Sequence, residues 1–246
     1  MQTTTGSTAH LLKDYDANIF MGLSEFEISQ TRLKSHNKNL QTLGSVICRH
    51  DLEDVVGISL LHKHFDISQK ELLVKEFVGN EAYTKPQVLT EQQTVTPYMW
   101  KLNRDEIKGG FGYYPLEFVR PSKQAKRAQE TASIVVNAKQ FLNEMADTML
   151  QLDLQEIFGI ATLHNDSALS VKHDEFLSET TDYENRTLRI RPEPKNESNR
   201  AKSTETLWRF TSSKDTGIPL IGCDVSCTGK VAAMHCSCGS HRPSNL

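Results

Sequence analysis

Two histidines follow a run of apolar residues in the first third of the chain. The segment 56–66 reads VGISLLHKHFD, a pattern that predicts a buried strand ending at His62 and His64. Because side chains alternate across a strand, the two imidazoles would point to the same side. Two neutral imidazoles at this spacing can bind one divalent metal ion. A carboxylate or a third histidine from elsewhere would complete a site with one position left open for chemistry.

A partial copy of this segment supplies both kinds of ligand. The windows 51–62 and 153–164 are identical at six of their twelve positions, and His164 lies 102 positions after His62. In the copy, His164 and Asp166 stand at the offsets of His62 and His64. The copy predicts an internal repeat and one set of metal ligands and catalytic groups, made of His62, His64, His164 and Asp166. Zinc, iron or manganese would suit these ligands.

The histidine pair also has two interpretations without a metal. In the first, His62 and His64 pack at a strand end and form only local hydrogen bonds. In the second, either imidazole acts as a general acid or base on a bound substrate.

A second candidate site lies near the end of the sequence. Cys223, Cys227, His235 and His241 have pair spacings typical of zinc ligands, although the gap between the two pairs is short for a standard finger. These four residues are the candidates for a structural zinc site. The alternative is a reduced, frayed tail over 223–246.

Four further residues are candidates for substrate binding. Arg189 and Arg191 would face the same way on a strand and could grip a carboxylate or phosphate. Tyr113 and Trp100 could form an aromatic pocket wall. The alternatives are a basic stripe facing solvent for the arginines and ordinary core positions for the aromatic residues.

Composition and motifs argue against several classes of protein. A net charge of −3 over 246 residues gives no electrostatic reason to expect a nucleic-acid partner. No apolar run is long enough to span a bilayer, and residues 1–7 lack the apolar core of a secretory signal. The glycines before 111–113 lack a phosphate-loop lysine, so we expect no nucleotide. A cytoplasmic, reducing location without a membrane partner follows as the expectation.

The elements that would position these residues alternate between helix and strand. Amphipathic patterns predict helices over 35–50 and 137–152, the second with Asn137 as its N-cap, and each leads into a histidine-bearing strand. Further extended segments are expected at 71–78, 87–101, 112–119, 187–191, 207–211 and 218–221.

This order of elements predicts a single α+β domain over residues 1–246. Two related units of a helix followed by antiparallel strands, at about 35–120 and 137–222, would form its sheet. Residues 1–10 are expected to be flexible and 223–246 to form the tail rich in cysteine and histidine.

Two short stretches resemble a family of uncharacterised fungal proteins of similar length. They are the run 50–66 with its Leu-Leu-His-Lys-His-Phe core, and Trp208-Arg209-Phe210 with the cysteine and histidine that follow late in the chain. The resemblance attaches no activity. It implies a fungal setting and a role in specialised metabolism.

The leading hypothesis is therefore a metal-dependent enzyme, of the hydrolase, lyase or isomerase type, that acts on a small molecule and uses a divalent ion such as zinc. Two alternatives stay open. One is a non-catalytic binding or interaction protein with a zinc-stapled C-terminus, and the other is a metal-free enzyme with a histidine acid or base.

Overall fold

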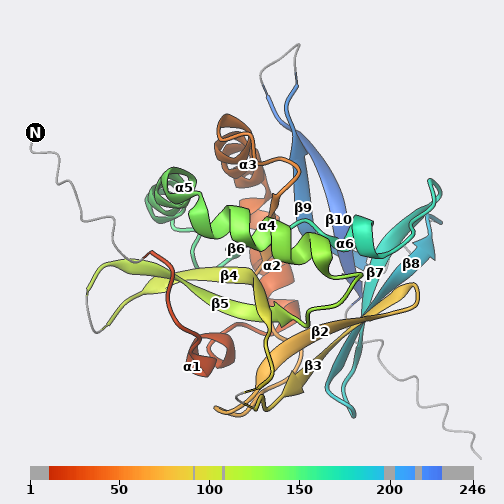
Figure 1. The fold of residues 1–246 in the computed structure, drawn as a ribbon. Helices are drawn as coiled ribbons and strands as arrows, with labels where there is room; N and C mark the ends of the chain where they lie inside the picture. Colours follow the sequence, from red (N-terminus) through yellow and green to blue (C-terminus); the bar gives the residue numbers. More distant parts are fainter. Residues whose placement is uncertain (1–10, 91, 107–108, 197–202, 214–217, 229–246) are drawn as a thin grey trace, which may run out of the picture.

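Ten strands of the chain close into one barrel, with helices packed on its outside (Figure 1). The computed structural model describes residues 11–90, 92–106, 109–196, 203–213 and 218–228. The strands are β1 (Val56–Leu60), β2 (Leu72–Val78), β3 (Glu81–Gln87), β4 (Thr96–Arg104), β5 (Phe111–Val119), β6 (Phe158–Thr162), β7 (Glu175–Asp182), β8 (Thr187–Pro194), β9 (Ser203–Thr211) and β10 (Leu220–Thr228). The helices are α1 (Ala17–Met21), α2 (Phe26–His36), the 3₁₀ turn η1 (Asn37–Asn39), α3 (Leu40–Arg49), α4 (Lys126–Asn137), α5 (Lys139–Gln151) and α6 (Asn165–Ala168).

The barrel runs β1-β6-β4-β5-β2-β3-β8-β7-β10-β9, and β9 pairs back onto β1 through Ile58 and Trp208. The pairs β2–β5 and β7–β10 are parallel, and the other neighbours are antiparallel. The predicted α+β fold with sheet-forming units is therefore wrong. Local alternation of residue types indicates strands but not their partners, and closure depends on contacts between strands about 150 residues apart in sequence.

The two halves of the chain, β1–β5 and β6–β10, are arranged alike in the barrel. If each strand of the first half is exchanged with its counterpart in the second, β1 with β6, β2 with β7 and so on, the order around the barrel stays the same. The two halves meet where β1 pairs with β6, in a register that places Ile58 opposite Ile160. The helices before these strands also end alike, because Asp51 and Asp153 both adopt left-handed backbone angles, with φ of 54° and 55°. An internal repeat would produce this symmetry, and it stays a prediction.

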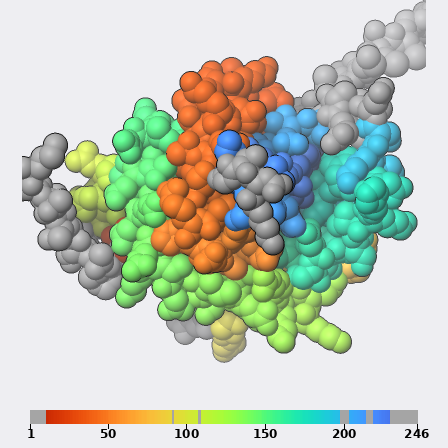
Figure 2. Space-filling view, turned by 90° about the horizontal axis from the view of Figure 1, so that it is seen from above, coloured from red at the N-terminus to blue at the C-terminus, as the bar shows by residue number. Residues whose placement is uncertain are grey.

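The largest core lies between the barrel and the helices. On one face of β1 and β6, the side chains of Ile58 and Ile160 belong to this core, together with Trp100 and Trp208 of the neighbouring strands. Helices α3 and α5 close it from outside, and Figure 2 shows the segments that carry α3 (orange) and α4–α5 (green) spread over this side. The other face of these strands lines the barrel interior. Both strands are therefore buried along their whole length.

The helix predicted over 35–50 is shorter and broken. Helix α2 ends at His36, η1 intervenes, and α3 starts at Leu40. The helix predicted over 137–152 is α5, but Asn137 does not cap it. The Asn137 amide donates instead to the carbonyl of Ser133, inside α4.

Glycine at the centre of the sheet lets neighbouring strands approach closely. A Cβ atom at Gly159 would lie 2.5 Å from the carbonyl oxygen of Trp100, which belongs to the backbone and cannot swing away. We expect Gly159→Ala to lower the free energy of unfolding by about 3 kcal/mol in urea denaturation. Gly222→Ala is the control, since its Cβ would meet only the flexible Arg209 side chain, at 3.3 Å. Equal unfolding midpoints for the two variants would contradict the close approach.

An ion pair fixes the loop that carries the two histidines. Arg186, in the turn between β7 and β8, donates two hydrogen bonds to the Glu71 carboxylate, of 2.9 and 2.8 Å, and one to the backbone oxygen of Asp66, of 3.3 Å. The two hydrogen bonds from Arg186, helped by one from the backbone N–H of Ser68, lower the pKa of Glu71 from 4.5 to about 2 against the opposing effect of burial. Because the folded-state pKa lies below the ordinary value, the pair stabilises the fold above pH 4.5. That stabilisation is lost as the pH falls towards 2.

We expect Glu71→Gln to lower the free energy of unfolding by about 1 kcal/mol at pH 7, because Arg186 is partly exposed and water screens the pair. The difference from wild type should shrink between pH 4.5 and 2. Glu175→Gln is the matched control. Glu175 accepts a backbone hydrogen bond from Lys172 just as Glu71 accepts one from Ser68, but its ion-pair partner is an exposed lysine. A pH-independent difference between wild type and Glu71→Gln would count against the ion pair.

Candidate metal site in the barrel interior

A cavity of about 50 Å³ lies inside the barrel. Its size suits a metal ion with one or two waters, or a small organic molecule. Nine of the ten strands contribute to its wall, which is mainly apolar. Its ionisable side chains are His62, His64, Lys75, Tyr98, Glu117, His164 and Glu179.

The two histidines reach this cavity from the loop that follows β1. The strand predicted to run to residue 66 ends at Leu60, and the backbone of Lys63 then pairs with the segment before α2. His62 and His64 still point to the same side, as the sequence predicted, with ring centroids 4.8 Å apart. The Phe26 ring of α2 packs against both imidazoles.

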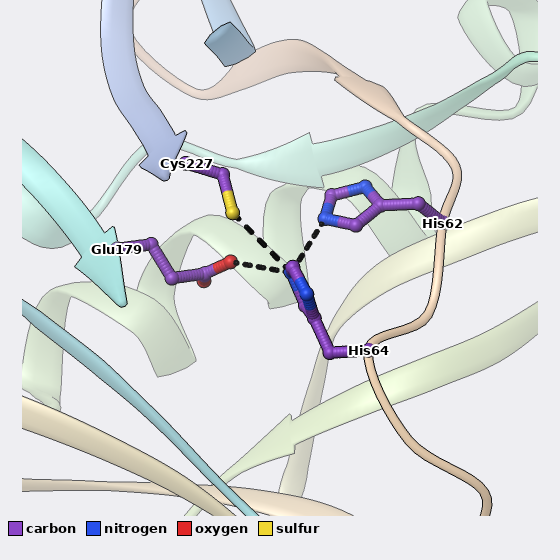
Figure 3. A group of neighbouring side chains, drawn as sticks. All are labelled: His62, His64, Glu179 and Cys227. Carbon is purple, nitrogen blue, oxygen red and sulfur yellow. Dashed lines mark hydrogen bonds and ion pairs between the residues drawn. The ribbon is translucent and has the colours of Figure 1, made fainter. Parts of the chain in front are cut away.

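Glu179 and Cys227 complete a cluster with the histidines (Figure 3). They are directly paired neighbours on the parallel strands β7 and β10. Nε2 of His64 lies 3.1 Å from Nε2 of His62, 3.3 Å from Sγ of Cys227 and 3.5 Å from Oε1 of Glu179. One ligand atom from each of the four residues lies within 4.8 Å of all the others.

Three of these distances resemble the edges of a tetrahedral zinc site, while other pairs of ligand atoms lie up to 4.8 Å apart and would move closer around an ion. Zinc binds nitrogen and oxygen at about 2.1 Å and sulfur at about 2.3 Å, so tetrahedral angles place two ligand atoms about 3.3 to 3.6 Å apart. The three separations from Nε2 of His64 all fall close to this range. The donor set of two imidazoles, a thiolate and a carboxylate is also one that zinc accepts.

Hydrogen bonds alone leave this cluster poorly satisfied. Nε2 of His64 carries at most one proton, yet three groups surround it. Nδ1 of His62 donates to the carbonyl of Leu60 at 2.8 Å, so Nε2 of His62 presents a lone pair to the cluster. A cation at the centre could be coordinated by one lone pair from each of the four residues.

Burial sets the protonation of the cluster. It lowers the pKa of His62 to about 4, with a further contribution from His64, so this imidazole is neutral at pH 7. Burial alone would raise the pKa of Glu179, but the hydrogen bond and charge of His64 outweigh it and lower that pKa. Burial and the nearby Glu179 raise the pKa of the Cys227 thiol. Cys227 would thus lose its proton only when a cation binds.

The predicted set of His62, His64, His164 and Asp166 does not meet at one point. His164 is 3 % exposed and lines the same cavity, but it is not one of the four residues of the cluster. Asp166 lies in α6 at the surface, where it forms an ion pair with Arg209. The short helix α6 begins at Asn165, three residues after β6 ends. The chain after β6 therefore turns into a helix where the chain after β1 continues as a loop to His64.

The predicted C-terminal zinc set is divided. Cys227 is buried in the barrel cluster, whereas Cys223 is exposed on the same strand. His235 and His241 lie outside the described residues.

The predicted substrate-binding residues lie elsewhere. Arg189 is paired with Glu81 and Arg191 with Glu193. Tyr113 and Trp100 are buried in the core between barrel and helices. None of these four predicted residues lines the cavity.

Sequence reasoning missed Glu179, Lys75 and Glu117. Two of them did leave a signal in the alternation of their strands. Lys75 stands between Leu73 and Phe77 on the inward face of β2, and Glu179 follows Leu177 on the inward face of β7. A charge on the apolar face of a strand lowers the stability of the fold unless it is paired or hydrogen-bonded, so such a position indicates a functional group.

Comparison with known proteins gave no match to a family model, a curated protein or a solved structure. The fungal resemblance therefore stays a prediction. Among the described helices, none has the length and apolar character needed to cross a bilayer.

The contrast between the two cysteines of β10 is testable by alkylation. In chelator-treated protein, we expect iodoacetamide to label exposed Cys223 at least about tenfold faster than Cys227, whose thiol is buried and protonated. Mass mapping of the two sites after timed quenching measures both rates. Urea should remove the difference, and equal rates in the folded protein would refute the buried position of Cys227.

Proposed function

We propose that this protein is a metal-dependent enzyme that acts on a small molecule inside the barrel. His62, His64, Glu179 and Cys227 would hold a divalent ion, and zinc is the ion best suited to this mixture of donors. The observation that carries the proposal is that four ligand atoms lie within 4.8 Å of one another beside an interior cavity. Bound zinc would act as a Lewis acid on a substrate oxygen or a water molecule, which would take a fifth coordination position or replace one of the four protein ligands.

Other polar residues of the cavity support catalysis over a purely structural metal. The Tyr98 hydroxyl donates a hydrogen bond to the Glu117 carboxylate. Burial raises the pKa of Glu117, which suits this group to hold a proton and transfer it to a substrate. A structural zinc site needs no such neighbour. Hydrolysis, elimination and isomerisation all combine a polarised oxygen with a proton transfer and are the reaction types proposed.

A non-catalytic binding protein is the second candidate function. A closed barrel with an interior cavity is an architecture that can hold one small ligand without chemistry. A metal-free enzyme would instead use the neutral imidazole of His62 as a base.

A cytoplasmic location belongs to the same proposal. Cys227 can bind a metal only while its thiol is reduced, and the cytosol maintains that state.

Metal content of the untagged protein tests the proposal. We expect elemental analysis to find one zinc per chain in wild type and at least about a hundredfold weaker zinc affinity in His64→Ala, because a ligand is lost. His164→Phe is the matched control, since it removes a buried histidine of the same cavity that lies outside the cluster. A chain ending at Thr228 retains all four ligands and should retain the zinc.

The outcomes separate the candidates. Zinc lost on truncation but retained in His64→Ala would move the metal to the C-terminal tail. Absence of metal in every sample would reject the metal-dependent enzyme and leave a histidine acid or base, or a binding protein.

A further inference from the structure

Lys75 is a buried lysine whose ammonium group has no direct hydrogen bond or ion pair within the described part of the chain. Its side chain comes from the inward face of β2, lines the cavity and is 3 % exposed. Its ammonium nitrogen lies 4.1 Å from the centroid of the Tyr98 ring. An ammonium group has three N–H donors, and the face of one aromatic ring cannot replace acceptors for all of them.

His164 presents an unused acceptor to the same cavity. Its Nδ1 lies 2.9 Å from the Thr162 hydroxyl and 3.1 Å from the Thr162 carbonyl oxygen. Donation to the carbonyl leaves the lone pair on Nε2. That Nε2 atom is buried and has no hydrogen-bond partner in the described part of the chain. The His164 ring packs edge-on against Tyr98, with centroids 5.0 Å apart, so the one tyrosine ring contacts both His164 and Lys75.

The exchange symmetry of the barrel relates these two residues to the metal cluster. In the parallel pair β2–β5, Lys75 stands opposite Val119, and in the parallel pair β7–β10, Glu179 stands opposite Cys227. Lys75 therefore occupies the position of Glu179 in the other half. His164 likewise corresponds to His62, and its Nδ1 makes the same hydrogen bond to a carbonyl two residues earlier.

We propose that Lys75 and His164 form the substrate-binding end of the cavity and receive a small hydroxycarboxylic acid. The carboxylate accepts hydrogen bonds from the Lys75 ammonium, and the hydroxyl donates to Nε2 of His164. A hydroxycarboxylic acid would then be the substrate of the enzyme proposed above, so this role rests on the proposed function. Binding of the acid by Lys75 and His164 does not itself require the metal.

The cavity favours a monoanion of few atoms. A volume of about 50 Å³ is too small for a sugar or a nucleotide, and a ligand of six non-hydrogen atoms such as lactate would require the cavity to widen. The Glu179 carboxylate, which acts on Lys75 through space, would repel a doubly charged phosphate more than a carboxylate.

Binding of lactate, compared with that of lactamide and propionate, tests the proposal. Ligand-observed NMR titration of the full chain should give at least about tenfold tighter binding for lactate than for lactamide, which lacks the charge, and tighter binding for lactate than for propionate, which lacks the hydroxyl. Lys75→Met, which retains the apolar stem, should remove the preference for lactate over lactamide. His164→Phe should remove the preference for lactate over propionate.

Two controls keep the inference independent of the metal. Lys75→Met should retain the metal content of wild type, and because it removes an unpaired buried charge it should unfold at the same or a higher temperature. Lactate binding that survives in Lys75→Met but fails in His64→Ala would place the carboxylate on the metal and overturn the proposal. Equal binding of lactate and lactamide by wild type would also overturn it. If wild type proves to be metal-free yet binds lactate through Lys75, the metal-dependent function fails and the binding site stands.

Discussion

Closure of the barrel is the constraint on which the rest of the structure depends. Pairing of β9 with β1 carries β10 to the side of the loop that follows β1, and thereby brings Cys227 within 3.3 Å of His64, 163 positions away in sequence. Without closure, β1 and β10 would be sheet elements with no reason to meet. The interior then becomes a small, water-poor space in which every polar group needs a specific partner.

The polar groups of that interior lower stability, and this cost is the reason for proposing functional roles for them. Lys75, Glu117 and Glu179 could each be replaced by apolar residues to fill a core of this size, and buried charges are often worth less than well-packed hydrocarbon. The helix-facing core, by contrast, is built on apolar residues such as Ile58 and Trp208. The barrel therefore separates the two tasks. Its outer face stabilises the fold, and its inner face holds the groups suited to chemistry.

The sequence predicted the parts of this structure that depend on local pattern. The strand before His62 and the helix α5 follow from periodicity over a few residues. His62 and His64 do point to the same side, but they lie on the loop after β1 and not at alternate positions of a strand. Their partners could not be predicted in the same way. Glu179 and Cys227 meet the histidines only through the order of strands around the barrel, and that order is set by contacts among distant segments. Asp166 was chosen by its offset from His164, but the turn into α6 directs it to the surface.

The two halves of the barrel place residues of opposite charge at equivalent positions of the cavity wall, Lys75 in one half and Glu179 in the other. If both halves carried the same residue where Lys75 and Glu179 stand, two ammonium groups or two carboxylates would face one small cavity and repel each other. A lysine in one half and a glutamate in the other remove that repulsion. The proposed metal ligands lie at one end only, because Val119 stands at the position that Cys227 occupies in the other half. One end can then hold a metal ion, while the other offers a fixed positive charge, and a substrate between them would be bound in a single orientation.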